Sequence, residues 1–252
     1  MNKPLNKIIC SILIFVFSVS TLFCGYMVYK EFIISRISIK VYEDLKNYVS
    51  VPTEIYDETD ISKDTLKDCP NINFTELETI NSDVVVWINI KNSEINYPVV
   101  QGTNNNYYLN HLIDGKENRA GCIFLDYRAN ISERHSIIYG HNMKNGTMFA
   151  DLTKYKKQSY YDGHKEGLLI TPEHTYVIQF FAGYVANLED FAWKIDFLSD
   201  EEFSIWLKNI KGKSSFLSDI IPRITDRIIT LSTCSYEFEN ARYVLHGVLV
   251  KT

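Results

Sequence analysis

Short runs of β-branched and aromatic residues recur along the chain from Ile80 to the C-terminus. Gly, Asn, Asp and Pro separate these runs, and such residues favour turns and interrupt strands. Aromatic residues make up 13% of the chain, which favours strands over helices. Eight runs of this kind predict a closed barrel or a sandwich. The predicted strands cover residues 84–90, 95–100, 121–125, 135–139, 168–171, 175–186, 227–233 and 242–250.

One helix is predicted between the sixth and seventh of these strands. Ser199 is followed by three acidic residues, an arrangement that caps the N-terminus of a helix and complements its dipole. Apolar residues then recur at helical spacing, so we expect a helix over residues 200–211. With no internal repeat, the chain is expected to form one soluble domain with a helical N-terminal extension.

An apolar segment over residues 8–29 carries no charged residue and is flanked by lysines. As a helix, at about 1.5 Å per residue, it is roughly 33 Å long, which is enough to cross a bilayer core. No Ala-x-Ala cleavage site follows it, and Cys24 lacks the small preceding residues of a lipoprotein signal. We therefore expect an uncleaved transmembrane anchor in the cell membrane, with residues 1–7 in the cytoplasm and the large domain outside.

The stretch after the anchor divides into two parts. Apolar residues at near-helical spacing predict a helix over residues 31–50. Residues 51–73 are rich in Asp, Thr, Ser and Pro and are expected to form a polar linker. The predicted organisation is a cytoplasmic N-terminus (1–7), a transmembrane anchor (8–29), a helical extension with linker (30–79) and a strand-rich domain (80–252).

Charge and cysteine content argue against several functional classes. A formal net charge of −5 gives no chain-wide positive field for a nucleic-acid backbone. Five cysteines occur without a C-x-x-C pair, so a zinc ribbon or a thioredoxin-like site is not supported, and we expect no metal and no other cofactor. Beyond the anchor lie Cys69, Cys122 and Cys234, an odd number that leaves at least one thiol free, while pairing of Cys69 with Cys122 stays open.

Cys234 directly follows the predicted strand 227–233. A thiol at a barrel mouth could act as a nucleophile, although a single cysteine is more often a small buried apolar residue. Arg242 opens the next strand, so a hairpin would bring both side chains to the same end of adjacent strands. There the guanidinium could stabilise an oxyanion or the thiolate. The alternative is a surface ion pair of Arg242 with Glu237 or Glu239.

Six histidines compete for an acid–base role beside this thiol. His141 follows the predicted strand 135–139 and Gly140 in a loop, and loops at strand ends are where functional residues concentrate. Structural roles are favoured for the other five. Of these, His111 is expected in a short helix, His135 at a strand start, His164 and His174 in turns, and His246 within the last strand.

Two motifs resemble those of the sortase family of Gram-positive bacteria. Residues 230–234 read Thr-Leu-Ser-Thr-Cys and are followed by Arg242, which is similar to the T-L-[ST]-T-C…R signature of sortases. Residues 139–143 read Tyr-Gly-His-Asn-Met and are similar to their catalytic-histidine motif. The order of anchor, helical extension, histidine, cysteine and arginine also matches that family.

Further matches resemble class B of that family. Residues 97–109 and 120–126 are similar to the early strands of class B members, which also carry a helix before the penultimate strand. The resemblance covers roughly residue 80 to the C-terminus. It implies a mainly β fold: a closed eight-stranded sortase barrel over residues 80–252, with N-terminal helices, a helix before the penultimate strand and a single transmembrane helix.

The resemblance also implies a reaction and a role for each catalytic residue. Cys234 would be the nucleophile, His141 the general acid and base, and Arg242 the residue that stabilises the oxyanion. Acting as a transpeptidase, the enzyme would cleave a sorting signal of the N-P-x-T-N or [SNP]-P-x-T-G type after its Thr. The thioacyl-enzyme would then pass the surface protein to a peptidoglycan amine, from diaminopimelate or a cross-bridge, and no cofactor is needed.

The resemblance extends to three candidate substrate-binding residues. Ser232, Asn105 and Leu109 match positions that line the substrate groove of class B members. One departure concerns the residues after the cysteine, which are Ser235 and Tyr236 where some class B members have acidic residues.

Other functions agree with the same residues. A Cys-His protease would form the same thioester but pass it to water, so a cell-wall amine would not divert its product to an amide. A membrane-anchored binding protein would bury an inert Cys234, which would then resist labelling by a vinyl sulfone or a methanethiosulfonate. The class B resemblance argues against an enzyme that builds pili.

Overall fold

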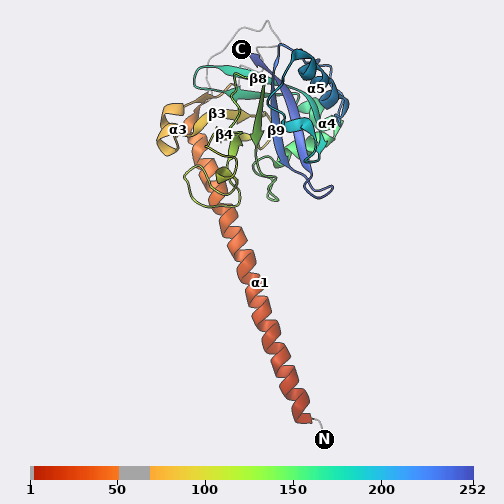
Figure 1. Cartoon of the computed structure of the whole chain (residues 1–252). Coiled ribbons are helices and arrows are strands. Elements are labelled where there is room, and N and C mark those ends of the chain that lie inside the picture. The colour runs from red at the N-terminus through yellow and green to blue at the C-terminus, as the bar shows by residue number, and fades with distance from the viewer. Residues whose placement is uncertain (1–2, 51–68) are drawn as a thin grey trace. The chain divides into compact units, whose positions relative to one another are not determined.

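The computed structural model describes residues 3–50 and 69–252 (Figure 1). Two compact units divide the chain, with the boundary between Val41 and Tyr42. The polar linker predicted over residues 51–73 lies largely outside the described residues.

A single long helix, α1 (Lys3–Leu45), makes up the first unit and ends in the second. The sequence contains no Gly or Pro between Tyr26 and Leu45, so nothing interrupts the helix after the apolar segment. The anchor and the following helix, predicted as separate elements, are therefore one helix. The predicted second helix was expected to reach Ser50, but α1 ends five residues earlier.

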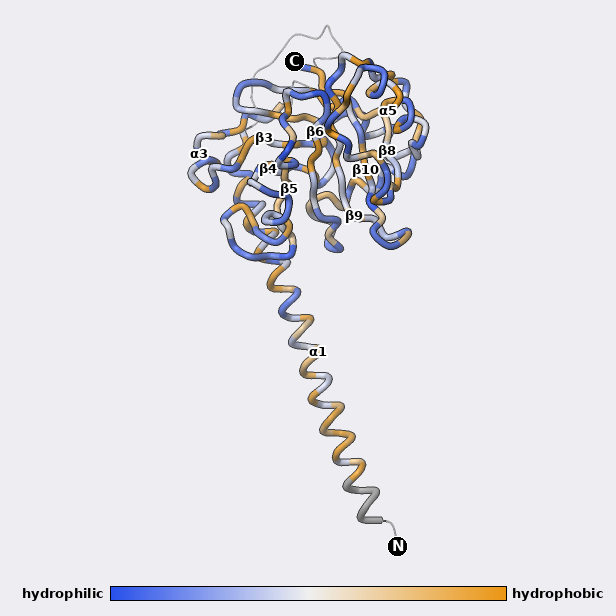
Figure 2. Tube along the Cα trace, viewed as in Figure 1, coloured by the Kyte–Doolittle hydropathy of each residue, from blue (hydrophilic) through white to orange (hydrophobic). Residues whose placement is uncertain are grey.

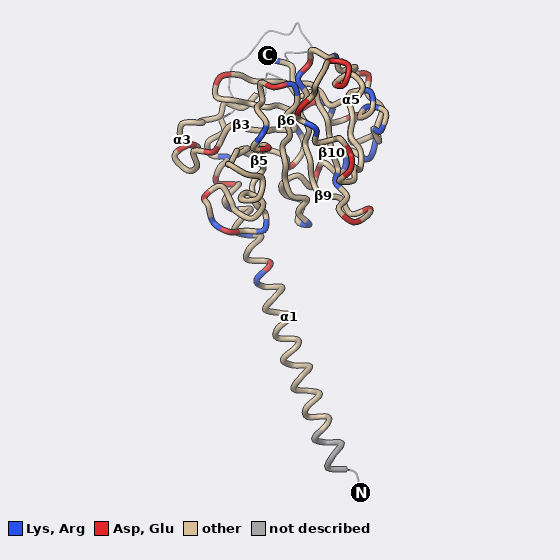
Figure 3. Tube along the Cα trace, viewed as in Figure 1, with Lys and Arg blue, Asp and Glu red and all other residues tan. Residues whose placement is uncertain are grey.

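The apolar part of α1 over residues 9–29 is uncharged, and many of its large apolar side chains are exposed. Figure 2 shows this stretch as mostly hydrophobic, and Figure 3 shows no charge along it. Among the described residues, α1 is the one helix that is long and apolar enough to cross a membrane.

Short elements precede the barrel in the second unit. Asn73 caps a helix that the sequence pattern did not predict, and its side-chain oxygen accepts a hydrogen bond from the Glu76 amide at 3.2 Å. Only two residues of this helix are buried, which leaves too little periodicity to recognise. The elements are η1 (Lys46–Tyr48), the antiparallel pair β1 (Val49–Ser50) and β2 (Asn71–Ile72), and the helix α3 (Phe74–Ile80).

Eight strands close into a barrel in the order β10-β8-β7-β3-β4-β5-β6-β9, with β9 paired to β10. The predicted mainly β fold is confirmed, and of the barrel and sandwich alternatives the barrel is correct. Each predicted run overlaps one strand. The strands are β3 (Val84–Asn89), β4 (Asn96–Val100), β5 (Ile123–Leu125), β6 (His135–Tyr139), β7 (Glu166–Ile170), β8 (Thr175–Ala186), β9 (Arg227–Cys234) and β10 (Arg242–Lys251).

Two neighbouring pairs in the barrel are parallel, β4 with β5 and β6 with β9. The second pair joins distant parts of the chain, since Tyr139 is the register partner of Ser232. Parallel strands end at the same edge of a sheet, so the loop after β6 meets the loop after β9. The intervening chain includes η3 (Ala150–Lys156), α4 (Gln158–Gly163), β7, β8 and the helix α5 (Asp200–Gly212).

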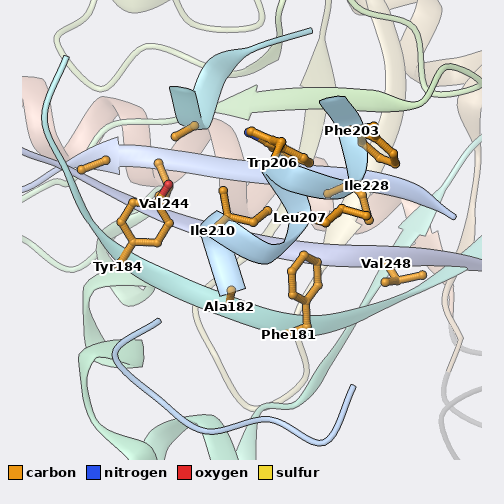
Figure 4. Close-up of a cluster of buried hydrophobic side chains, with 12 residues drawn as sticks. Phe181, Ala182, Tyr184, Phe203, Trp206, Leu207, Ile210, Ile228, Val244 and Val248 are labelled. Carbon is orange, nitrogen blue, oxygen red and sulfur yellow. The ribbon is translucent and has the colours of Figure 1, made fainter. Parts of the chain in front are cut away.

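The helix α5 confirms the helix predicted before the penultimate strand. The Ser199 hydroxyl accepts a hydrogen bond from the Glu202 amide at 3.1 Å, which is the N-cap that the sequence indicated. Trp206 and Leu207 of this helix pack into an apolar cluster with residues of β8, β9 and β10 (Figure 4).

The two faces of β9 therefore lie in different environments. Ile228 belongs to the cluster under α5, on the outer face of the strand (Figure 4). Ile229 and Leu231 point the opposite way and are fully buried, which places them in the barrel interior. By the same alternation, Thr230, Ser232 and Cys234 share the outer face with Ile228.

Candidate active site

The C-terminal end of β9 carries Cys234, directly opposite Arg242 at the start of β10. The predicted hairpin is present: residues 235–241 form its loop, and the Ser235 amide donates to the Ala241 carbonyl at 2.9 Å. The guanidinium of Arg242 also donates to that carbonyl, at 3.1 Å. Cross-strand pairing thus brings the thiol and the guanidinium to one end of the barrel.

His141 lies just beyond β6, level with the end of β9. The Gly140 amide donates to the Ser232 carbonyl at 3.1 Å, and the Thr233 hydroxyl donates to the Gly140 carbonyl at 2.7 Å. Position 140 favours glycine, because a Cβ there would lie 2.4 Å from Cδ1 of Ile123 and 2.8 Å from the ring of Phe149. These contacts extend the parallel pairing past the strand end and bring the imidazole to the thiol.

The orientation of the His141 ring is set by a backbone carbonyl. Its Nε2 lies 2.7 Å from the carbonyl oxygen of Leu109, at the end of η2 (Tyr107–Leu109). A carbonyl oxygen can only accept, so Nε2 must carry a hydrogen. Nδ1 is then the nitrogen that is left to interact with Cys234.

Thiol and imidazole shift each other's proton affinity. The hydrogen bond with His141 is the main cause that lowers the pKa of Cys234; burial opposes it, and the charge of Arg242 adds to it. The same hydrogen bond is the main cause that raises the pKa of His141, again against burial. Opposite shifts favour a thiolate beside an imidazolium, and the thiolate is the nucleophilic form of cysteine.

Asn142 connects the two loops of the site. Its side-chain Nδ2 donates to the Cys234 carbonyl at 2.9 Å, and its backbone carbonyl accepts from the Tyr236 hydroxyl at 3.3 Å. The sequence analysis missed this residue. The available signal was its place directly after the histidine, in a loop that the parallel pairing brings to the cysteine.

Two of the candidate substrate-binding residues lie in one segment near His141. The side chain of Leu109 is 39% exposed, and its carbonyl holds the imidazole. Asn105 uses its side chain within the protein: Nδ2 donates to Oδ2 of Asp126 at 3.0 Å, and Oδ1 accepts from the Tyr127 amide at 3.0 Å. The structure thus brings Leu109 to the histidine and ties Asn105 to a neighbouring carboxylate.

Asp126 is fully buried at the centre of that network. It accepts hydrogen bonds from Asn105, from the Tyr139 hydroxyl at 3.0 Å and from the Arg128 guanidinium at 2.9 and 3.0 Å. Burial raises its pKa, but the hydrogen bonds from Arg128 and the other donors outweigh that effect and the pKa is lowered. Because Tyr139 lies two residues before His141, the network links the Asn105 segment to the histidine strand.

The third candidate, Ser232, is buried. Its hydroxyl accepts a hydrogen bond from the indole Nε1 of Trp193 at 3.1 Å. Trp193 is partly exposed and lies in η4 (Phe191–Trp193), which precedes α5. The indole therefore covers the serine. Sequence reasoning missed Trp193, because the contact depends on how the connection after β8 folds over β9.

The remaining histidines lie outside this arrangement. His111 was expected in a short helix, which is wrong: the backbone leaves helical geometry at Asn110 (φ −136°), and His111 forms an isolated bridge with Glu117. The other four lie as predicted: His135 at the start of β6, His246 within β10, His164 between α4 and β7, and His174 between β7 and β8.

A cavity of about 270 Å³ lies beside the site, lined by residues of η3 and of the loop after β9. Lys156 pairs with Glu237 and donates to Ser235 Oγ at 3.0 Å, and that hydroxyl donates to Glu237 at 2.5 Å. Burial raises the pKa of Glu237, but Lys156 and Ser235 outweigh it and lower the pKa to about 2. Glu237 therefore pairs with Lys156, and a carboxylate does reach the residue after Cys234.

The other thiols of the second unit differ from Cys234. Cys69 and Cys122 are both free, so the pairing that the sequence left open is not formed. Burial raises the pKa of Cys69, and it raises the pKa of Cys122 to about 12. Of the three, only Cys234 has a lowered pKa.

A barrel edge that holds a thiol of lowered pKa against an imidazole, beside a guanidinium, is the arrangement that cysteine acyl-transfer enzymes use. A family model for the sortase domain matches residues 88–250. The chain is 38% identical to sortase B of Listeria monocytogenes, over 69% of this chain and 73% of that relative. It is 36% identical to sortase B of Staphylococcus aureus, over 71% of this chain and 75% of that relative.

Solved structures agree with these relatives. Sortase B from Bacillus anthracis matches with a TM-score of 0.74 at 32% identity, covering 88% of this chain and 100% of that one. Sortase B from S. aureus matches with a TM-score of 0.68 at 36% identity, covering 71% and 87%. The chain therefore belongs to the sortase family, in class B, and is a cysteine transpeptidase.

Proposed function

We propose that Cys234, His141 and Arg242 carry out acyl transfer on the sorting signal of a surface protein. The supporting observation is the pair of opposite pKa shifts, which favours a thiolate at Cys234 and a proton on His141. A thiolate can attack a carbonyl carbon, and a protonated imidazole can give its proton to the leaving amine. Arg242 lies opposite the thiol, where its guanidinium can donate hydrogen bonds to the oxyanion.

The proposed reaction has two halves. In the first, the Cys234 sulfur bonds to the carbonyl carbon of the signal's Thr, the peptide C–N bond breaks, and His141 protonates the leaving amine. In the second, an amine attacks the thioester carbonyl and gives a proton to His141. The C–S bond then breaks, which restores the thiolate–imidazolium pair and leaves the surface protein joined through a new amide.

The proposed partners are a sorting peptide and a peptidoglycan amine. Solved structures of S. aureus sortase B with a substrate and of sortase B with triglycine support this pair of partners. The signal would be of the N-P-x-T-N or [SNP]-P-x-T-G type, and the amine would come from diaminopimelate or a cross-bridge. Three residues would line the groove: Leu109, Ser232 and Asn105. Leu109 lies beside His141, and Ser232 is covered by Trp193.

We also propose that α1 anchors the enzyme in the cell membrane with the catalytic barrel outside. The uncharged stretch over residues 9–29 supports the anchor, since it is apolar enough to cross a membrane. Residues 1–7 would then be cytoplasmic, 8–29 the anchor, 30–79 the extension and 80–252 the catalytic barrel.

The deciding experiment mixes the full chain, in detergent micelles, with fluorogenic peptides of both signal types, with and without a diaminopimelate-like or pentaglycine amine. We expect cleavage that yields an amide when the amine is present. Cys234→Ala should abolish cleavage and thioacyl formation, while Cys69→Ala, which removes a thiol of raised pKa, should not. Acid as the sole product with either amine would indicate a protease, and an unreactive Cys234 would indicate a binding protein.

A further inference from the structure

A short turn beside the active-site strand is held by side chains from other elements. Residues 191–194, here called the clamped turn, comprise η4 and the residue after it. Trp206 of α5 donates its Nε1 hydrogen to the Phe191 carbonyl at 2.8 Å. Trp193 within the turn donates to Ser232 of β9 at 3.1 Å. The turn is therefore fixed both to the helix above it and to the strand below it.

A buried chain of hydrogen bonds fixes the end of the clamped turn. Nδ1 of His135 lies 2.7 Å from the Lys194 carbonyl, and Nε2 of the same ring lies 2.7 Å from Oγ1 of Thr230. That hydroxyl also lies 2.7 Å from Nδ1 of His246. His135, Thr230 and His246 are fully buried, so water does not compete for these bonds.

The direction of every hydrogen bond in this chain follows from the carbonyl at its end. Burial lowers the pKa of His135 to about 4 and lowers that of His246 as well, so both rings are neutral near pH 7. The Lys194 carbonyl only accepts, hence the His135 hydrogen is on Nδ1 and its Nε2 accepts from the Thr230 hydroxyl. Thr230 has one hydrogen to give, so it must accept from Nδ1–H of His246.

This chain of hydrogen bonds has a cost in folding stability. Nε2 of His246 is then an acceptor without a hydrogen-bond partner in a buried position. It lies among aromatic rings, with Phe181, Tyr184 and Trp206 at centroid distances of 6.2, 5.6 and 5.9 Å from the His246 ring. An apolar ring at position 246 would fill such a site without a desolvation cost. Stability alone therefore does not account for the chain.

The hydrogen-bond chain lies on the same face of β9 that carries the Cys234 thiol. Thr230, Ser232 and Cys234 alternate along β9 and share its outer face, next to the cluster shown in Figure 4. Ser232 therefore holds the clamped turn directly through Trp193, and Thr230 holds it indirectly through His135. Phe191 of the turn is 71% exposed and Trp193 partly so, which leaves aromatic surface available on the turn that contacts Ser232, two residues before Cys234.

We propose that Thr230 and His135 are positioning residues, which hold the clamped turn against β9 so that its aromatic side chains form a rigid wall for the sorting peptide. The proposal rests on the proposed function, since it assigns the wall to the peptide side of the thiol. A preformed wall needs no ordering when the peptide binds. Loss of the hydrogen-bond chain should therefore weaken peptide binding more than it slows the acyl-transfer step.

Thr230→Val tests the proposal, because valine keeps the shape of threonine but removes the hydroxyl that joins the two histidines. Thr230→Ser is the matched control that keeps the hydroxyl. We expect Thr230→Val to raise KM for the fluorogenic peptide about tenfold, the effect of about one buried hydrogen bond, with a much smaller change in kcat. Thr230→Ser should restore most of the wild-type KM.

Two further readouts on the full chain separate positioning from general damage. The rate of Cys234 alkylation by a small electrophile should be similar in both variants, because the thiol and His141 lie outside the hydrogen-bond chain. Amide hydrogen exchange in the clamped turn, including the Lys194 amide that donates to Phe191 at 3.2 Å, should be faster in Thr230→Val than in Thr230→Ser. Equal exchange, or a fall in kcat and alkylation with KM unchanged, overturns the proposal.

A measurement on the unmodified protein covers the case in which Thr230→Val does not fold. Nitrogen chemical shifts of the imidazoles at neutral pH should show both His135 and His246 as neutral rings with the hydrogen on Nδ1. A ring that is charged, or that carries its hydrogen on Nε2, contradicts the assigned hydrogen-bond chain. If the wild-type protein cleaves no peptide, the proposed function fails, whereas the exchange and nitrogen-shift results still decide whether the turn is clamped.

Discussion

Cys234 and His141 depend on each other for their charge. One hydrogen bond is the largest cause of both pKa shifts, downward for the thiol and upward for the imidazole. A titration of this site therefore reports the pair and not either residue alone. The Leu109 carbonyl contributes by fixing the tautomer, which leaves Nδ1 for the thiol.

The pH dependence of Cys234 alkylation measures this coupling. The thiolate is the reactive form, so a lowered pKa should keep alkylation fast at a pH below the ordinary thiol pKa of about 8.5. His141→Ala removes the main cause of the lowering while burial still opposes ionisation, so the midpoint should move to higher pH. His164→Ala, away from the thiol, should leave it in place. An unchanged midpoint in His141→Ala contradicts the coupling.

Arg242→Lys tests the role of the guanidinium. We expect kcat/KM for the peptide to fall by about 10²-fold or more, because an ammonium cannot reproduce the fixed donor geometry of arginine at an oxyanion. Arg223→Lys is a suitable control, since Arg223 forms a surface pair with Asp226. Wild-type kinetics for Arg242→Lys would assign Arg242 a structural role.

At the scale of elements, the Asp126 network joins the segment that bears Asn105 to β6. The carboxylate has no exposed side-chain surface, while its partner Arg128 is half exposed. Five other residues donate to it or to its backbone carbonyl: Asn105, Arg128, Tyr139, Gln101 and Ala129. Such a buried, fully bonded carboxylate holds loops in place that would otherwise have few contacts with the barrel.

Asp126→Asn should destabilise the protein by about 1–3 kcal/mol near pH 7, because it weakens buried hydrogen bonds to a charge. The pKa of Asp126 is lowered on folding, so its stabilisation is present above the unfolded pKa of about 4 and is lost as pH falls through the folded value. Thermal unfolding of variant and wild type should therefore converge in acid. The exposed Asp219→Asn should match wild type throughout, and a constant difference at every pH contradicts the assignment.

Much of the barrel could be predicted because its strands leave a local signal. Alternation and turn residues marked all eight strands, and the Ser199 cap marked α5. The hairpin placed Cys234 opposite Arg242 for the same local reason. Asn142, Trp193 and the Thr230 chain could not be predicted, because their partners lie on elements distant in sequence. The contacts of Asn142 with Cys234 and of His135 with Thr230 follow from the parallel pairing of β6 with β9, and the contact of Trp193 with Ser232 follows from the way the connection after β8 folds over β9. No periodic pattern encodes either arrangement.

At the scale of the whole molecule, α1 combines two elements that the sequence predicted as separate. Its first part carries the uncharged residues, and its last residues belong to the same unit as the barrel. Because no Gly or Pro separates the two parts, the helix continues from the apolar segment to Leu45 without a break.

Lysine substitutions test whether this helix anchors the chain. Leu13→Lys combined with Phe17→Lys places two charges in the uncharged stretch, each costing about 2.5–3.5 kcal/mol at the centre of a membrane helix. We expect the full chain to remain in membranes after carbonate extraction and the double variant to be released. Leu198→Lys, at a highly exposed position of the second unit, should stay with the membrane. Retention of the double variant would contradict a spanning helix.

The parallel pairing of β6 with β9 also determines when the enzyme becomes reactive. About half of the barrel sequence, including β7 and β8, separates these strands, so their contact has a high sequence separation and is slow to form. Before it forms, Cys234 has no imidazole beside it, and its thiol is mostly protonated at neutral pH. The newly made chain therefore carries a weakly reactive cysteine until the barrel is complete, and closing the barrel brings the imidazole that activates it.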